Sequence, residues 1–172
     1  MDLKMQTPRA VDIAITHQCN LRCRYCSHFS GPGDSGQDLP LNEWLPFFEE
    51  LNHGAVLHVT LQGGEPFYRA DLEDVVNGIV RNRMRFNILS NGTLITRERA
   101  VFLGDTGRCD GVQVSIDGSD ADTHDAFRGT GTFRQAVRGV EHLQAAEVPV
   151  SVRVTIHRKN VHHLADIARF LL

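Results

Sequence analysis

The chain has 172 residues, of which 41% are hydrophobic, and 18 Lys and Arg against 21 Asp and Glu give a formal net charge of -3. These values exclude disordered and fibrous classes, and the mild acidity provides no basic surface for nucleic acid. No apolar run reaches the roughly 18 residues that a membrane span needs, and residues 1–10 lack a hydrophobic signal core. We therefore expect one cytoplasmic domain.

Short β-branched runs alternate five times with longer amphipathic stretches. Strands are predicted over 10–16, 55–62, 85–90, 111–117 and 150–156. Helices are predicted over 41–52, 71–82, 96–103, 133–146 and 161–172, and Asp71 and Thr96 are expected to act as N-caps. Residues 30–37 are rich in Gly, Pro, Asp and Ser and are expected to form a loop.

The strict alternation of strands and helices predicts an α/β fold with parallel strands, either an open doubly wound sheet or part of a (β/α) barrel. Eight barrel units take about 250 residues, so this chain holds about five and cannot close a full barrel. The last predicted helix ends without a cap or a polar tail, which indicates a fragment boundary and an exposed edge at the fifth strand.

Side-chain alternation separates an apolar face from a polar face in the predicted strands. The apolar residues, which we expect to pack under the helices, are Val11, Ile13, Ile15, Leu57, Val59, Leu61, Val112, Val114, Ile116, Val152, Val154 and Ile156. The second face is polar in four strands, which predicts a lumen that holds a polar ligand and water. An antiparallel sheet with one solvated face is the alternative.

Three of the four cysteines lie within eight residues, directly after the first predicted strand: Cys19, Cys23 and Cys26. In a cytosolic chain, such clustering is more typical of a metal or redox site than of disulfides. Three thiolates can hold a cluster and leave one metal position open to a ligand. The alternatives are a zinc site completed by His17 or His28, and a buried cysteine stripe at i, i+4 and i+7 of a helix. Cys109 is isolated, and we assign it no function.

The CxxxCxxC motif formed by these cysteines resembles that of the radical S-adenosylmethionine (SAM) superfamily, whose three cysteines bind a four-iron, four-sulfur (4Fe-4S) cluster. Further motifs agree in order: GGEP at 63–66, SNGT at 90–93, SIDG at 115–118 and HDAFRG at 124–129. The set is most similar to the peptide-modifying and anaerobic sulfatase-maturing (SPASM-type) branch. By this resemblance, 1–172 is the N-terminal portion of a radical SAM core domain, without the sixth βα unit and the C-terminal auxiliary-cluster domain.

The resemblance implies a radical SAM enzyme of the oxidoreductase or peptide-maturase type. In this family the reduced cluster cleaves SAM to a 5′-deoxyadenosyl radical, which removes hydrogen from a substrate, here a peptide or protein. It also implies a low-potential electron donor of the flavodoxin or ferredoxin type. The alternative is a non-catalytic iron-sulfur module, such as an electron carrier or an inactive partner, which would have no need of the SAM-contact motifs.

The glycine pair and the acid that follows it are candidates for the SAM site. Gly63 and Gly64 lack a Cβ, so the backbone can approach a ligand closely, and Glu65 can accept a hydrogen bond from an ammonium group. By resemblance, this segment binds the SAM amino group. Glycine pairs at strand ends are also common as simple turns.

Polar residues at the ends of the next strands are candidates for the ribose and carboxylate groups. Ser115 and Asp117 share one face, where they can hydrogen-bond a ribose together with Asn91, unless they only form a polar strand end before an Asp-Gly turn. By resemblance, Arg128 pairs with the SAM carboxylate. Arg153, on the same face as Ser115, is a second candidate, and either arginine could be structural.

Two further residues gain a candidate role by resemblance. Tyr25, between two of the cysteines, matches a position beside the SAM adenine, although it could serve packing alone. Gln62, directly before the glycine pair, matches a substrate-site glutamine of the sulfatase-maturing enzymes and is a catalytic candidate.

Overall fold

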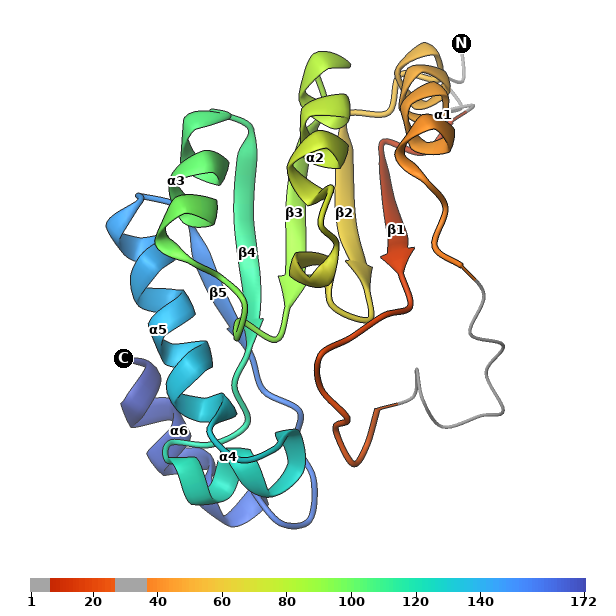
Figure 1. Cartoon of the computed structure of the whole chain (residues 1–172). Helices are drawn as coiled ribbons and strands as arrows, with labels where there is room; N and C mark the ends of the chain where they lie inside the picture. The colour runs from red at the N-terminus through yellow and green to blue at the C-terminus, as the bar shows by residue number, and fades with distance from the viewer. Residues whose placement is uncertain (1–6, 27–36) are drawn as a thin grey trace, which may run out of the picture.

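The computed structural model describes residues 7–26 and 37–172. Its sheet contains five parallel strands, which pair in the order in which they occur in the sequence. They are β1 (Ala10–Thr16), β2 (His58–Gly63), β3 (Arg85–Ser90), β4 (Cys109–Ser115) and β5 (Val150–Arg153). The sheet is not closed (Figure 1), which confirms the predicted partial (β/α) barrel. The strand order lacks the reversal of a doubly wound sheet, and the parallel pairing excludes the antiparallel alternative.

A helix follows each strand, and β4 is followed by two. The helices are α1 (Leu41–His53), α2 (Leu72–Arg81), α3 (Arg97–Asp105), α4 (Ala121–Arg128), α5 (Thr132–Ala145) and α6 (Leu164–Leu171), with 3₁₀ helices η2 (Pro66–Tyr68) and η3 (Val161–His163). The sequence did not predict α4. Thr96 caps α3 as predicted, because its hydroxyl accepts from the Arg99 N–H at 3.3 Å. Asp71 occupies the N-cap position of α2, as predicted, but its carboxylate pairs with Arg69 and makes no cap hydrogen bond.

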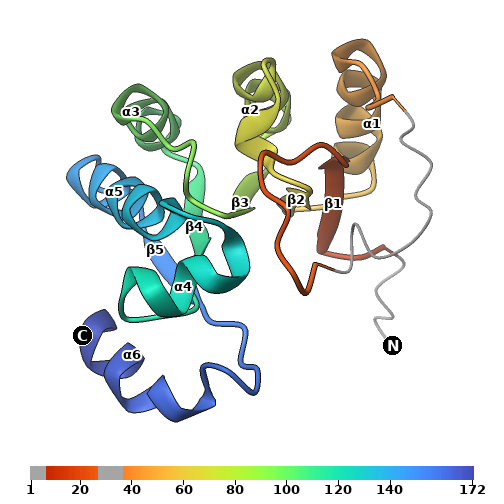
Figure 2. The same ribbon diagram turned by 60° about the horizontal axis from the view of Figure 1, so that its bottom comes forward.

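The hydrophobic core lies between one face of the sheet and the row of helices α1, α2, α3 and α5, which Figure 2 shows as an outer arc. Its centre consists of strand residues with no exposed surface: Val59, Leu61, Phe86, Ile88, Val112 and Val114. Burial of a side chain of this size stabilises the fold by about 1.5–3 kcal/mol. For Leu57 and Ile156 the expected burial is wrong, as they are 56% and 61% exposed. Both lie just outside β2 and β5, where strand alternation no longer sets the face.

The opposite face of the sheet carries the polar residues. The register pairs Gln62 with Ala14, and Ser115 with Arg153, near the carboxyl ends of the strands. These ends come forward in Figure 2, where the loop after β1 lies in front of them. Loops at this end build the sites of parallel barrels. Within residues 7–26 and 37–172, no helix has the length and apolar character needed to cross a membrane.

Candidate functional site

A pocket of about 220 Å³ lies at the carboxyl ends of the strands. Its lining comprises Cys19, Leu21, Cys23, Tyr25, Cys26, Gln62, Gly63, Gly64, Leu89, Ser90, Asn91, Gln113, Ser115, Arg128 and Arg153. Segments that are far apart in the sequence therefore meet at one place. All of the predicted site residues line this pocket except Glu65 and Asp117.

The loop that carries the cysteines leaves β1 and contains no helix over residues 17–26. A turn joins two of the cysteines, since the Cys26 N–H donates to the Cys23 carbonyl at 3.1 Å. The Arg24 N–H donates to the Phe127 carbonyl at 2.9 Å, which ties the loop to α4. The alternative of a helical cysteine stripe is therefore wrong.

The Cys19 and Cys23 sulfurs lie in an environment that a cation would stabilise. Burial raises the pKa of the Cys19 and Cys23 thiols, and negative charge on neighbouring sulfurs raises the pKa further. Thiolates, and not thiols, are the metal ligands, so bound metal would offset this repulsion. The donor set thus fits a cationic iron centre.

The arrangement does not resemble a site for a single metal ion. Within the described ranges, no three His, Cys, Asp or Glu side chains are grouped to hold one. His17 faces Asp38, with 3.5 Å between Nε2 and Oδ1, and His28 lies outside the described residues. The zinc alternative through His17 therefore has no geometric support. In an iron-sulfur cluster each cysteine binds a different iron, so the thiolates need only surround one cavity.

The glycine pair is required by the close approach of two backbone segments. A Cβ on Gly63 would lie 2.1 Å from the Thr16 carbonyl oxygen, and a Cβ on Gly64 would lie 2.2 Å from that of Gln18. Gly63 also has φ of +127°, a region that favours glycine. In addition, the Gly64 N–H donates to the Thr16 carbonyl at 2.8 Å. The pair therefore supports the base of the cysteine loop as well as lining the pocket.

Glu65 does not face the pocket. Its side chain is fully buried, where Oε1 accepts from the Ser90 hydroxyl at 2.8 Å and from the Phe67 N–H at 3.1 Å. Oε2 accepts from the Asn91 N–H at 2.7 Å. Burial raises the pKa of Glu65 to about 7. Through these bonds Glu65 ties the end of β2 to the end of β3.

Asp117 is also buried behind the pocket, two residues after β4 ends. Its carboxylate accepts from Arg128 Nε at 2.5 Å, from the Thr155 N–H at 2.8 Å and from the Tyr25 hydroxyl. Burial alone would raise the pKa of Asp117, but the hydrogen bond and charge of Arg128 outweigh it and hold the pKa below its usual range. Asp117 positions Tyr25 and Arg128, which line the pocket themselves.

Asn91 connects the end of β3 with the cysteine loop. Its Nδ2 donates to Asn20 Oδ1 at 2.9 Å, and its Oδ1 accepts from the backbone and hydroxyl of Thr93 at 2.9 and 2.7 Å. Asn20 Nδ2 in turn donates to the Thr93 hydroxyl at 2.9 Å. Asn20 and Thr93 thus belong to the hydrogen-bond network at the end of β3, a role that sequence reasoning missed.

Other polar side chains in the pocket remain available to a ligand. Those without a side-chain hydrogen bond to any described residue are Gln62, Gln113, Ser115 and Arg153. Arg128 also lines the pocket and engages Asp117 through Nε, and among the described residues its terminal nitrogens make no hydrogen bond. Sequence reasoning missed Gln113, although its position two residues before Ser115 on the polar face was a usable signal.

His124 hydrogen-bonds the backbone of Asp117. The imidazole is fully buried, its Nδ1 accepts from the Asp117 N–H at 3.1 Å, and its Nε2 has no partner in the described part of the chain. Burial lowers the pKa of His124 to about 4, and the nearby Arg128 charge adds to the effect. The imidazole is therefore neutral at pH 7.

This histidine predicts a specific dependence of stability on pH. Between pH 6.5 and pH 4 the unfolded state binds a proton that the folded state excludes, so the free energy of unfolding falls as the pH decreases. Relative to a His124→Asn variant, the wild type should lose about 2–3 kcal/mol between pH 7 and pH 4. Urea denaturation at each pH measures this, with His162→Asn on the exposed η3 as control. If the free energy of unfolding changed with pH in the same way in the wild type and in His124→Asn, His124 would not be the buried neutral histidine that causes this dependence.

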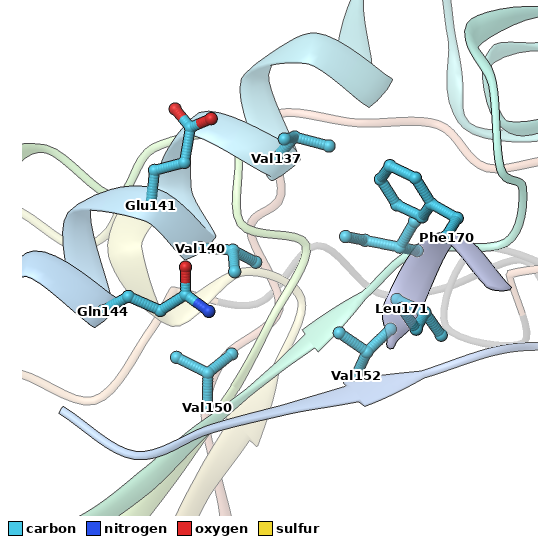
Figure 3. Close-up of a pocket in the computed structure, with 9 residues that line it drawn as sticks. Val137, Val140, Glu141, Gln144, Val150, Val152, Phe170 and Leu171 are labelled. Atoms are coloured by element: carbon cyan, nitrogen blue, oxygen red, sulfur yellow. The ribbon is translucent and has the colours of Figure 1, made fainter. Parts of the chain in front are cut away.

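A larger cavity, of about 530 Å³, lies between α5, β5 and α6. Figure 3 shows the valines of α5 and β5 around it, with Phe170 and Leu171 at one end. Its polar side chains are limited to Glu141 and Gln144, and no cysteine lines it. The smaller pocket at the strand ends is therefore the candidate functional site.

Comparisons with known proteins agree with this geometry. The profile of the Radical SAM superfamily matches residues 13–171. PqqA peptide cyclase of Bradyrhizobium diazoefficiens is 35% identical over 161 residues, which cover 93% of this chain and 42% of that protein. Mycofactocin maturase MftC of Mycobacterium tuberculosis is 36% identical over 165 residues, which cover 95% of this chain and 42% of that protein. The chain thus spans about two fifths of the length of these relatives.

Solved structures share the fold. The crystal structure of Streptococcus suis SuiB bound to precursor peptide SuiA matches with a TM-score of 0.81 at 17% identity, over 95% of this chain and 36% of SuiB. The family match over nearly all of the residues implies a 4Fe-4S cluster and SAM as cofactors. The chain belongs to the radical SAM superfamily.

Proposed function

We propose that this chain forms the cluster- and SAM-binding core of an enzyme that modifies a peptide or protein. The observation that supports the proposal best is the single pocket that gathers three cysteines, the glycine pair and polar side chains without protein partners. When bound, the cluster would supply one electron to SAM, which would yield methionine and a 5′-deoxyadenosyl radical able to remove a hydrogen atom. The protein supplies binding, orientation and exclusion of water.

In this proposal, Cys19, Cys23 and Cys26 would hold the cluster through their thiolates, and a three-cysteine set would leave one iron available to SAM. Arg128, fixed by Asp117, offers its terminal nitrogens to the SAM carboxylate, because a guanidinium suits carboxylates geometrically. Holding Arg128 in place before the ligand arrives reduces the entropy that binding must remove.

The remaining contacts divide between SAM and substrate. Ser115 offers a hydroxyl to the ribose, and the Tyr25 ring, 5.6 Å below the Arg128 guanidinium, offers a flat surface to the adenine. Gln62 and Gln113 offer amides that match the donors and acceptors of a peptide backbone. Arg153 offers a second positive charge at the same level as Ser115.

The relatives support a peptide as the substrate class. One bears the name PqqA peptide cyclase, and the SuiB crystal contains a precursor peptide. We further propose a low-potential flavodoxin or ferredoxin as electron donor, and a cytoplasmic location, where thiols stay reduced.

The proposal predicts that the reconstituted chain cleaves SAM. After anaerobic reconstitution and chemical reduction, mass spectrometry should detect 5′-deoxyadenosine that depends on both SAM and reductant. A deuterated peptide substrate should then transfer deuterium into this product. A chain that binds a cluster and never cleaves SAM would instead be a non-catalytic iron-sulfur module. SAM cleavage without deuterium transfer from any peptide would contradict the substrate class alone.

A further inference from the structure

Arg69 lies outside the pocket, yet it holds both ends of the chain segment that carries the cysteines. Its side chain is only 6% exposed. Nη1 donates to the Ile15 carbonyl at 2.7 Å and to the Leu39 carbonyl at 3.1 Å, and Nη2 donates to Leu39 at 3.2 Å. Ile15 belongs to β1, four residues before Cys19, and Leu39 lies two residues before α1.

Asp71 fixes the Arg69 guanidinium in this orientation. The carboxylate accepts from Nε at 2.9 Å and from Nη2 at 2.8 Å, which is the bidentate geometry that favours arginine over lysine. A buried guanidinium without a carboxylate partner would lower the stability of the fold, because its charge would lose hydration without compensation. The ion pair therefore allows a positive charge to sit beneath the β1 exit.

A second set of contacts fixes the same segment one residue further on. Asp38 accepts from the Thr16 hydroxyl at 2.5 Å and from the His17 N–H at 3.1 Å. The Glu65 N–H donates to the Gln18 carbonyl at 2.9 Å. Together with Arg69, these bonds hold the backbone from Ile15 up to the residue before Cys19.

We propose that Arg69 is a positioning residue for the cluster: by joining Ile15 to Leu39 it sets the direction in which the chain leaves β1 toward Cys19. This inference rests on the proposed cluster-binding function. Because Arg69 already joins Ile15 to Leu39, the chain between them loses less conformational entropy when the cluster assembles. Residues that support metal ligands through hydrogen bonds also hold those ligands in place.

The test compares Arg69→Gln with the matched variant Arg99→Gln. Arg99 also donates to two backbone carbonyls, those of Phe67 at 2.6 Å and Leu94 at 3.2 Å, but it touches neither end of the cysteine segment. After anaerobic reconstitution we expect Arg69→Gln to hold at least four-fold less iron than the wild type, whereas Arg99→Gln holds the wild-type amount. Arg69→Lys keeps the positive charge but loses the bidentate guanidinium geometry, so its iron content should lie between those of the other two variants.

Two readouts separate positioning from general stability. In the metal-free protein, amide hydrogen exchange over residues 17–26 should be at least ten-fold faster in Arg69→Gln and unchanged in Arg99→Gln. The electron paramagnetic resonance spectrum of the remaining reduced cluster should change in Arg69→Lys. Equal iron content in the wild type and in both Arg69 variants would overturn the positioning role of Arg69 and leave the proposed function standing. A wild-type chain that takes up no iron would overturn the proposed function, and the inference with it.

Discussion

Replacement of Cys23 with Ala should abolish cluster iron and 5′-deoxyadenosine formation together, because three thiolates are needed and two remain. Cys23 is half-buried, lines the pocket and forms the turn to Cys26. We expect the free energy of unfolding of the metal-free chain to change by no more than about 1 kcal/mol, since the lost sulfur is partly exposed. Iron and sulfide content per chain, followed by product analysis, measures the effect.

Cys109 provides the matched control. It is also a half-buried cysteine, but it begins β4 and does not line the pocket. Burial raises the pKa of its thiol to about 11, so it stays protonated at neutral pH. Cys109→Ala should therefore retain the wild-type iron content and product yield. Wild-type iron in Cys23→Ala, or an equal loss in both variants, would show that the triplet is not the ligand set.

Hydrophobic periodicity sufficed to predict the sheet but not α4. The bounds of β1 and β3 match the predicted ranges. The buried residues of α4 are His124 and Arg128, so this helix has no apolar stripe for periodicity to detect. The inward face of α4 is polar because His124 and Arg128 hydrogen-bond Asp117. These polar contacts stand where a helix usually carries apolar core residues.

The candidate site was predictable where chemistry depends on spacing along the chain. Cys19, Cys23 and Cys26 lie close in sequence, and one loop brings them to one pocket. The roles of Glu65 and Asp117 were not predictable in this way, because a strand-end position does not reveal which way a side chain turns. Alternation was extended from Ser115 to Asp117, but β4 ends at Ser115 and the rule ends with it.

Contacts over long sequence distances account for the rest. Arg69 reads as a surface residue after a turn, yet its acceptors lie 54 and 30 residues away, at Ile15 and Leu39. Nothing in the local sequence identifies a backbone carbonyl as the partner of a guanidinium. Such residues emerge only when the strands have been placed in register.

Removal of the Asp117 carboxylate should give the largest loss of stability in this site. Asp117→Ala leaves the Arg128 charge buried without a partner, at 8% exposure, and removes the acceptor of Tyr25 and Thr155. Breaking a buried pair from one side costs about 3–5 kcal/mol. The double variant Asp117→Ala/Arg128→Met removes both charges, so we expect it to be more stable than Asp117→Ala alone. Urea denaturation of the metal-free chain measures all three proteins.

The exposed Asp110–Arg85 pair provides a control that shows whether burial, and not the distance between the charges, determines the loss of stability. Asp110 accepts from Arg85 Nε at 2.5 Å, the same separation as in the Asp117–Arg128 pair, but the two side chains are 34% and 48% exposed. Because water solvates an exposed pair in either state, Asp110→Ala should cost no more than about 1 kcal/mol. Similar losses for Asp110→Ala and Asp117→Ala, or a double variant weaker than Asp117→Ala, would refute the role of Asp117 as the buried counter-charge. With the predicted ordering, the acid of the SIDG motif acts by holding Arg128 and Tyr25 at the pocket wall.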